Sequence, residues 1–558
     1  MPPPALTRSH LLMFGVLLVA VLAISARGLL DPDVGWPDAD RVLMDGLFVH
    51  DFLREFDFSH LWKGDFIARA YQYAIGYFAQ YPALSLGSRP PLFPAVEAVF
   101  FFLFGVSDAS AKLSLLGFTL LGMVAWHDLI RRTHDQTTAL FATGLLFTAP
   151  FIVQWVWYPM LEIPALALIL VTANLFWRFA DTGQAKWLYW TILALSLALW
   201  TKQTSLFAIP WFLAWLLITG RLKATLTRRS TWLAVSLGVL LTLPLAVLTV
   251  WMGKTNLALA FQGVDQSSAQ LSWTSWAFLR QYLDLLVQVQ LPLPVLLLSG
   301  LGALTALLHR DRQALFFLLL ILTTYLFFTA LHSYRIDRYT IFWVPGFALF
   351  AALPWYHLRA HPWSRPVGYL VMLALLGLQI QQSINKTPAF TRGHREAAQL
   401  AMHHSRSGRI FMDGINNGYF TCFVRLNDPG RRHHVLRGDK LLHSSSVFTE
   451  HATQIHVRDL AGIRTLLDQH GIDILVIEER NYAQLEIHQI LRDFLKTDAF
   501  ELLKTIPIHS TRSQLMNQNL LVYRYREAKP PSIDRFSLSV PLVGKSFEVP
   551  VAPGSLKP

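Results

Sequence analysis

A short acidic stretch, residues 37–46, holds the residue types best suited to catalysis. It contains Asp38, Asp40 and Asp45 together with Arg41, and it follows the first hydrophobic segment closely. Charged side chains are expensive near a bilayer, so a cluster beside a membrane segment indicates a functional site. A positioned carboxylate can act as a general base toward an attacking hydroxyl group. The stretch therefore predicts acid–base chemistry at a membrane surface.

One further carboxylate and several cations lie near the ends of later apolar segments. The carboxylate is Glu162, and the cations are Arg89, Lys202, Arg335 and Arg338. Arginine presents a planar fork of N–H donors that matches phosphate oxygens. A phosphate leaving group is stable as an anion, and cations or a divalent metal ion must balance its developing charge. Carboxylates and cations together predict transfer from a phosphate ester such as a lipid-linked sugar.

Structural roles are alternatives for the acidic residues. Asp45 and Asp51 fit the polar side of an interfacial helix, because Leu43, Leu47 and Leu53 follow at helical spacing. For these two aspartates we favour the structural role. Asp38 and Asp40 precede that helix, and for them we favour the functional role.

Structural roles are also open for the remaining candidates. Glu162 suits a helix N-terminus, where the helix dipole favours negative charge. Lys202 suits a terminal lysine that extends to the membrane interface. Arg335 and Arg338 flank Asp337 and could form a salt-bridged loop of their own.

The elements that must position these residues lie mostly in a membrane. The chain has 558 residues, of which 53% are hydrophobic and 15% charged, and its mean hydropathy is positive. This composition is typical of a membrane protein with a soluble portion. The net charge of +12 is attributed to cytoplasmic loops and anionic lipid rather than to nucleic acid. The single cysteine, Cys422, excludes an intrachain disulfide.

Eleven apolar runs predict about eleven transmembrane helices. They are Leu11–Leu30, Ala111–Leu129, Thr138–Val153, Ile163–Phe179, Trp187–Thr201, Leu206–Thr219, Trp232–Met252, Leu291–Leu308, Ala314–Leu331, Ile341–Tyr356 and Val367–Ile384.

A twelfth apolar run, Leu92–Phe104, is shorter and follows a proline pair, so we predict an interfacial or re-entrant helix. With it left out of the span count, the five loops between spans 2 and 3, 4 and 5, 6 and 7, 8 and 9, and 10 and 11 lie on one side of the membrane. These loops carry most of the Lys and Arg found in loops. The positive-inside rule then places these loops and the N-terminus in the cytoplasm. The acidic stretch, Glu162, Lys202 and the segment 335–338 fall together on the opposite face.

The composition changes after residue 386, and residues 387–527 predict a small extracytoplasmic α/β domain. We expect helices at Arg395–His404 and Arg458–His470, with Gly471 as a C-cap. Strands are expected at Arg409–Met412, Ile472–Ile477 and Leu520–Tyr525. The proline-rich residues 528–558 are expected to be disordered. The pairs His403/His404 and His433/His434 are interpreted as surface histidines rather than metal ligands, because adjacent residues do not share a helix face.

Five motifs in the first 350 residues, in order and on one side, resemble the GT-C superfamily of integral-membrane glycosyltransferases. The branch most similar contains bacterial proteins related to protein O-mannosyltransferases and the aminoarabinose transferases of lipid A. The motifs are Pro37-Asp38-Ala39-Asp40-Arg41, Arg89-Pro90-Pro91-Leu92 through Gly105-Val106-Ser107-Asp108, Tyr158-Pro159-Met160-Leu161-Glu162-Ile163-Pro164, Trp200-Thr201-Lys202, and Arg338-Tyr339 through Pro345-Gly346.

The resemblance implies a GT-C module over residues 1–386, with juxtamembrane helices in the first extracytoplasmic loop at 31–110. It implies a glycosyltransferase of the bacterial inner membrane that uses a polyprenyl-phosphate sugar and an extracytoplasmic acceptor. Family members commonly have Asp-Glu where this chain has Asp38-Ala39, so we take Asp38 as the candidate base and Asp40 as the alternative.

By the same resemblance Glu162 organises the site by orienting the acceptor or holding a cation. Arg89, Lys202, Arg335, Arg338 and Tyr339 are then the candidate donor-phosphate ligands. No cofactor is assigned, although a divalent cation remains open.

Two other functional classes remain. A transporter or flippase of lipid-linked glycans would use the same charges along a pathway, but such proteins usually show pseudo-symmetric halves. A scaffold for envelope assembly would keep the fold without catalysis, and Ala39 is the feature that favours it.

Overall fold

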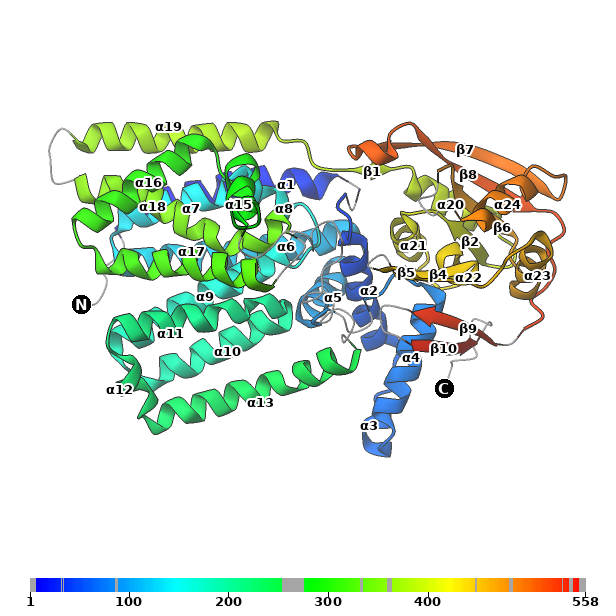
Figure 1. Ribbon diagram of the computed structural model, residues 1–558, viewed down its shortest axis with the longest axis horizontal. Helices are drawn as coiled ribbons and strands as arrows, with labels where there is room; N and C mark the ends of the chain where they lie inside the picture. Colours follow the sequence, from blue (N-terminus) through cyan, green and yellow to red (C-terminus); the bar gives the residue numbers. More distant parts are fainter. Residues whose placement is uncertain are drawn as a thin grey trace.

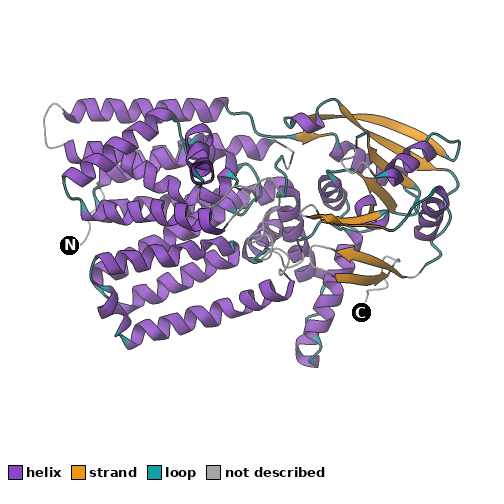
Figure 2. Cartoon of the chain, viewed as in Figure 1, coloured by secondary structure: helices purple, strands orange, loops and turns teal. Residues whose placement is uncertain are grey.

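The computed structural model describes residues 7–31, 33, 35–85, 89–252, 275–331, 335–358, 364–446, 449–480, 485–533, 535–540 and 545–550. Figure 2 shows a helical part and a mixed part that contains the sheet. In Figure 1 the long helices lie on the left and run roughly parallel, and the sheet lies on the right. Helices α2 (Ala39–Glu55) and α4 (Phe66–Gln80) lie between the two parts and run across the direction of the long helices.

The other helices of the helical part follow in chain order. They are α1 (Arg8–Leu30), α3 (His60–Lys63), α5 (Leu92–Phe104), α6 (Asp108–Thr133), α7 (Gln136–Phe147), α8 (Pro150–Val156), α9 (Glu162–Thr182), α10 (Ala185–Thr201), η1 (Gln203–Phe207), α11 (Ala208–Ile218), α12 (Leu222–Leu226), α13 (Arg229–Met252), α15 (Trp276–Leu285), η2 (Leu286–Gln290), α16 (Leu293–Leu308), α17 (Arg312–Leu331), η3 (Asp337–Trp343), α18 (Val344–Leu358) and α19 (Ser364–Asn385).

All eleven predicted membrane segments are helical. Among the described residues, six helices are long and apolar enough to cross a bilayer, namely α1, α6, α9, α13, α17 and α19. The predicted segment Thr138–Val153 corresponds to α7 and α8, which bend by 63° at a short break and together count as a seventh. The other four segments fall on shorter helices. The chain is therefore a membrane protein, and eleven spans remains a prediction.

Helix α5 has the bounds predicted for the interfacial run, Leu92–Phe104. It ends where Gly105 adopts a left-handed φ of 83°, which glycine tolerates without strain. α5 packs against α2 and α6. Helix α2 buries Val42, Leu43 and Leu47, as their helical spacing predicted, whereas Leu53 near its end is exposed.

The C-terminal part is a six-stranded mixed sheet with helices, as the change in composition predicted. Its strand order is β1-β7-β8-β6-β2-β3, with β2 parallel to β3 and β6 and the other pairs antiparallel. The strands of this sheet are β1 (Thr391–Arg392), β2 (Arg409–Asp413), β3 (His434–Arg437), β6 (Ile474–Glu478), β7 (Phe500–Ser510) and β8 (Gln518–Tyr525). The helices are α20 (His394–His404), α21 (Asn417–Leu426), α22 (Gly438–Leu441), α23 (Leu460–His470) and α24 (Glu486–Phe494), with η4 (Ser513–Leu515).

The elements predicted for this part match α20, α23, β2, β6 and β8 to within two residues at each end. Gly471 caps α23 with a φ of 62°, as expected. A second small sheet pairs β4 (His443–Ser446) with β5 (Thr449–Ile455).

The C-terminal tail differs from the prediction of disorder. Residues Arg535–Val540 (β9) and Lys545–Pro550 (β10) form an antiparallel hairpin, which lies beside α22 and α4. The sequence of β9 alternates apolar and polar residues, and this period-2 pattern favours a strand. The prolines around the hairpin obscured that short signal.

A buried ion pair joins the helical part to the sheet part. Arg425 of α21 donates Nη2–H to Asp51 of α2 at 2.6 Å, and both side chains are almost fully buried. The Tyr77 hydroxyl of α4 also donates to Asp51, at 2.8 Å. Burial favours a neutral Asp51, but hydrogen bonds from His50, Arg425 and Tyr77 hold its pKa at about 2. Asp51 therefore has a structural role, as the sequence favoured, but it is fully buried between the two parts and does not lie on an exposed polar side of the helix.

We expect Arg425→Met to lower the free energy of unfolding by about 3–5 kcal/mol, because it leaves Asp51 buried and unpaired. Asp51→Asn combined with Arg425→Met should recover part of that loss. Thermal unfolding of the purified full chain measures both. The matched control is Arg69→Met, which removes an exposed pair with Asp65 and should cost about 1 kcal/mol or less. An equal effect of the two arginine substitutions would contradict the role of the buried pair.

Candidate active site

A cluster of charged side chains lies where the helical part meets α2. Asp38 precedes α2 with a left-handed φ of 78°, a conformation that aspartate tolerates better than most residues. Its two carboxylate oxygens face different guanidinium groups. Arg89 Nη2 lies 3.4 Å from Oδ1, and Arg338 Nη2 lies 3.3 Å from Oδ2. The Asp38 side chain keeps 34% of its surface exposed, so solvent or a ligand can reach it.

Glu162 and Lys202 complete the cluster from two further helices. Glu162 is the first residue of α9, and Lys202 caps the C-terminus of α10. Lys202 Nζ donates to Glu162 Oε1 at 2.9 Å, and Arg338 Nε lies 3.7 Å from the same oxygen. Arg338 of η3 therefore lies between Asp38 and Glu162. The ring of Tyr339 packs beside Lys202, with Nζ 5.6 Å from the ring centroid.

Several polar atoms of the cluster are buried without a hydrogen-bond partner. Within the described residues, Glu162 Oε2, Arg338 Nε and Arg338 Nη1 make no hydrogen bond. A buried polar atom without a partner costs free energy, and such atoms are often completed by a ligand or water. Three cations and two carboxylates give this cluster a net positive charge, which suits an anionic group.

Asp38 is held in its ionised form. Burial favours the neutral carboxyl, but Arg89, Arg338 and Arg41 together lower the pKa of Asp38 to about 2. The contacts to Arg89 and Arg338 are longer than the 2.7–2.9 Å of a tight charge-assisted bond. An incoming anion can therefore compete with Asp38 for both guanidinium groups.

Two predicted site residues lie outside this cluster. Asp40 is buried against Gly418 of α21, and its burial raises its pKa. Arg335 packs its guanidinium over the Phe278 ring, 3.5 Å from the centroid, and donates to Gln281 Oε1 at 3.0 Å. Among the described hydrogen bonds and ion pairs, none joins either residue to Asp38 or Glu162, although the charges of Asp38 and Arg89 act on Asp40. The structure thus gathers Asp38, Glu162, Arg89, Lys202, Arg338 and Tyr339 into one cluster.

Asp45 has a role that the sequence did not indicate. Its Oδ1 accepts a hydrogen bond from the backbone N–H of Ser85 at 2.9 Å, on the segment that leads to Arg89. A backbone donor leaves no signature in a sequence. Burial raises the pKa of Asp45 to about 6, although Arg89 and Ser85 oppose the shift. Glu97 of α5 is fully buried against Gly46, and an isolated glutamate in an apolar helix was a signal that sequence analysis could have used.

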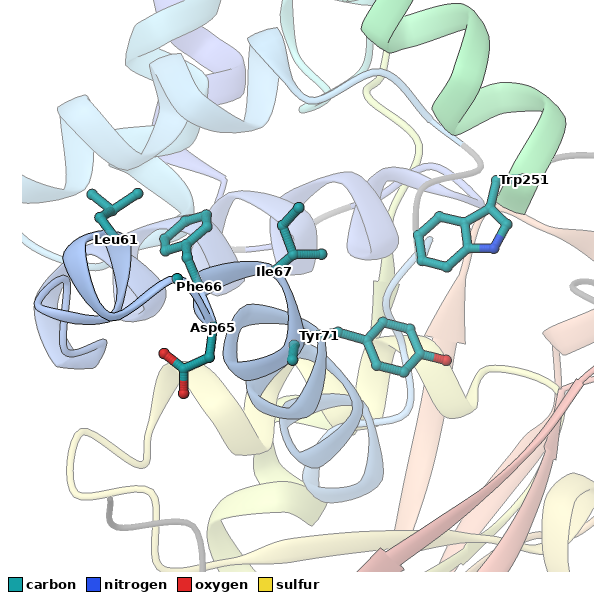
Figure 3. Close-up of a pocket in the computed structure, with 8 residues that line it drawn as sticks. Leu61, Asp65, Phe66, Ile67, Tyr71 and Trp251 are labelled. Carbon is teal, nitrogen blue, oxygen red and sulfur yellow. The ribbon is translucent and has the colours of Figure 1, made fainter.

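A cleft of about 580 Å³ lies apart from the ionic cluster, between the α3–α4 turn and the end of α13. Figure 3 shows Leu61, Phe66 and Ile67 on one side and Trp251 on the other. The Trp251 and Tyr71 rings lie 5.9 Å apart. Ile67 is 79% exposed, as expected for a juxtamembrane segment that meets lipid. The residues lining the cleft include none of the predicted site residues.

The described residues contain no group of three or more His, Cys, Asp or Glu side chains placed to hold a metal ion. The cluster itself combines two carboxylates with three cations. Its donor set therefore fits an anionic ligand better than a divalent cation.

Comparison with known proteins supports the GT-C resemblance. The family model for dolichyl-phosphate-mannose-protein mannosyltransferase matches residues 88–248. The crystal structure of ArnT from Cupriavidus metallidurans in the apo state has a TM-score of 0.61 at 15% identity, covering 93% of this chain and 99% of that chain. No curated protein sequence matches the chain.

Two further structures are similar. ArnT from Cupriavidus metallidurans bound to undecaprenyl phosphate has a TM-score of 0.57 at 13% identity, covering 91% of this chain and 97% of that one. The Archaeoglobus fulgidus oligosaccharyltransferase, tethered with an acceptor peptide, has a TM-score of 0.55 at 10% identity, covering 84% and 68%. The matched family and these neighbours are GT-C glycosyltransferases. The chain has the GT-C fold, so the resemblance inferred from the sequence is confirmed.

The raised pKa of Asp45 predicts a loss of stability as pH rises. The folded state binds this proton more tightly than the unfolded state, so the stabilisation is complete below pH 4 and is lost between pH 4 and 6. Asp45→Asn keeps an acceptor for Ser85 and carries no charge. We expect its free energy of unfolding at pH 7 to exceed that of the natural chain by about 1–3 kcal/mol. Thermal unfolding of the purified chain measures the difference.

The same comparison at pH 4 should show no difference between the two proteins. Asp57→Asn, on a fully exposed aspartate, is the control and should give no such pH-dependent gain. An Asp45→Asn protein whose difference in stability from the natural chain is the same at pH 4 and at pH 7 would contradict the assignment.

Proposed function

We propose that this chain is a membrane glycosyltransferase that moves a sugar from a polyprenyl-phosphate donor to the hydroxyl group of an extracytoplasmic acceptor. The observation that carries the proposal is Asp38 held between Arg89 and Arg338, with unpartnered atoms of Arg338 buried beside it. The GT-C fold supports it, and so does the ArnT structure bound to undecaprenyl phosphate.

The donor phosphate would bind Arg338, Lys202 and Arg89, beside the ring of Tyr339. Glu162 contacts Lys202 and Arg338 and would hold both in position as the phosphate arrives. Because the phosphate competes for the guanidinium groups, it would weaken their contacts with Asp38. The pKa of Asp38 would then rise from about 2 toward its ordinary value, and the carboxylate would become a stronger base.

In the transfer step, the acceptor oxygen forms a bond to the anomeric carbon of the sugar while the bond from that carbon to the phosphate oxygen breaks. The electron pair of the broken bond remains on the phosphate, where the three cations balance it. Asp38 takes the proton from the acceptor hydroxyl. Arg335 and Asp40 remain more distant candidates, for a phosphate contact and for the base.

We propose that the ionic cluster and the sheet part face the outside of a bacterial inner membrane. The excess of Lys and Arg in the opposite loops supports this orientation. The archaeal oligosaccharyltransferase, whose structure holds an acceptor peptide, supports the use of a separate acceptor.

Asp38→Asn should lower the rate of sugar transfer about 10²–10⁴-fold, because it removes the base and keeps the side-chain shape. The measurement is sugar release from a panel of radiolabelled polyprenyl-phosphate sugars by purified protein in lipid. Asp40→Asn tests the alternative base, and Asp57→Asn is the control at an exposed position. Full activity of Asp38→Asn would remove Asp38 as the base. Loss of activity in Asp40→Asn alone would assign the base to Asp40. Donor transport without sugar release would favour a flippase.

Arg89→Gln should shift the acid limb of the kcat/KM profile upward by about one pH unit. The shift arises because the free enzyme loses one of the cations that lower the pKa of Asp38. The readout is the midpoint of that limb, which is separate from any general loss of donor binding. Arg69→Gln, on the exposed side of α4, should leave the midpoint unchanged. An unchanged midpoint in Arg89→Gln would argue against Asp38 as the titrating base.

A further inference from the structure

A groove of about 420 Å³ lies between α1, α6 and α9. It is formed near the start of α1 and the ends of α6 and α9, at the end of the helical part that Figure 1 shows farthest from the sheet. Its apolar walls come from Leu11, Phe14, Leu121, Val124, Val171 and Leu175. Several of these face outward, and Val124 is 54% exposed. The groove is therefore open to the lipid around the helices.

Three arginines surround one carboxylate at the groove. Asp128 of α6 accepts hydrogen bonds of 2.7 Å from each of Arg131, Arg132 and Arg178. Asn174 donates to the same carboxylate at 3.1 Å. Arg131 and Arg178 also line the groove. One negative charge against three positive charges leaves this cluster with a net charge of about +2.

The other titratable groups that line the groove do not cancel this charge. His10 and His127 share a hydrogen bond of 2.8 Å between their Nε2 atoms. One ring must donate a proton and the other must accept it, so at least one of the two is neutral. Neither ring can carry negative charge. The groove therefore combines a positive polar end with an apolar wall.

We propose that this groove binds the phosphate headgroup of an anionic phospholipid, with an acyl chain along Leu121 and Val124. Arginine pairs with phosphate oxygens, and an anionic lipid supplies both the missing negative charge and a hydrocarbon chain. The site is separate from the ionic cluster around Asp38. Glu162 and Arg178 lie at opposite ends of α9, about 24 Å apart at 1.5 Å per residue.

The test uses the purified full chain in detergent, titrated with phosphatidylglycerol or phosphatidylcholine of matched acyl chains. Native mass spectrometry measures bound lipid, and we expect about tenfold tighter binding of phosphatidylglycerol. The double variant Arg131→Gln/Arg178→Gln should lose this preference. Its matched control is Arg229→Gln/Arg312→Gln, which removes two exposed arginines at the same end of the bundle and should keep it.

A steric variant keeps the test decisive if the double variant does not fold. Val124→Trp fills the groove from an outward-facing position without changing charge, and it should lose the bound lipid. Val239→Trp, at a 58% exposed position on α13, should retain it.

Three results would overturn the proposal. The first is equal binding of the two lipids by the natural chain. The arginines would then serve only to hold α6 and α9 together through Asp128. The second is an unchanged preference in Arg131→Gln/Arg178→Gln or in Val124→Trp. The third is displacement of the lipid by inorganic phosphate at equal concentration, which would indicate a site for soluble anions.

Discussion

The arrangement of this protein depends on balancing charge at the boundary of a membrane. Glu162 begins an apolar helix and is almost fully buried, so it requires cations close by. Lys202 and Arg338 supply them from α10 and η3, and Arg338 then reaches Asp38 at the start of α2. Segments that are distant in the sequence are in this way fixed around one small volume. The charges that stabilise the arrangement are the same charges that suit a phosphate.

Helix α2 connects this cluster to the rest of the molecule. Asp38 lies at its N-terminus, and Asp51 near its other end forms the buried pair with Arg425 of the sheet part. Asp45, between them, accepts a hydrogen bond from the backbone N–H of Ser85. A displacement of the sheet part would therefore act on α2 and, through it, on the position of Asp38. The sheet part thus contacts the helix that carries Asp38, although none of its described residues belongs to the charged cluster.

Much of this could be predicted from the sequence, for identifiable reasons. Long apolar runs favour helices in a bilayer because a helix satisfies its backbone hydrogen bonds within one segment, and the eleven predicted segments are helical. The sequence placed Asp38, Glu162, Lys202 and Arg338 on one face, and the structure brings these four side chains together. Sequence spacing could not reveal that Arg335 turns toward α15, because that depends on the rings of Phe278 and Tyr282. The hydrogen bond from the backbone N–H of Ser85 to Asp45 could likewise not be predicted from the sequence.

The packing of Asp40 against Gly418 has a consequence for how the two parts fit together. A methyl group at position 418 would collide with the Asp40 carboxylate. The absence of a side chain at this glycine therefore allows the close spacing between α2 and α21. Any larger residue would push α2 and α21 apart, and the displacement would act along α2 on the position of Asp38.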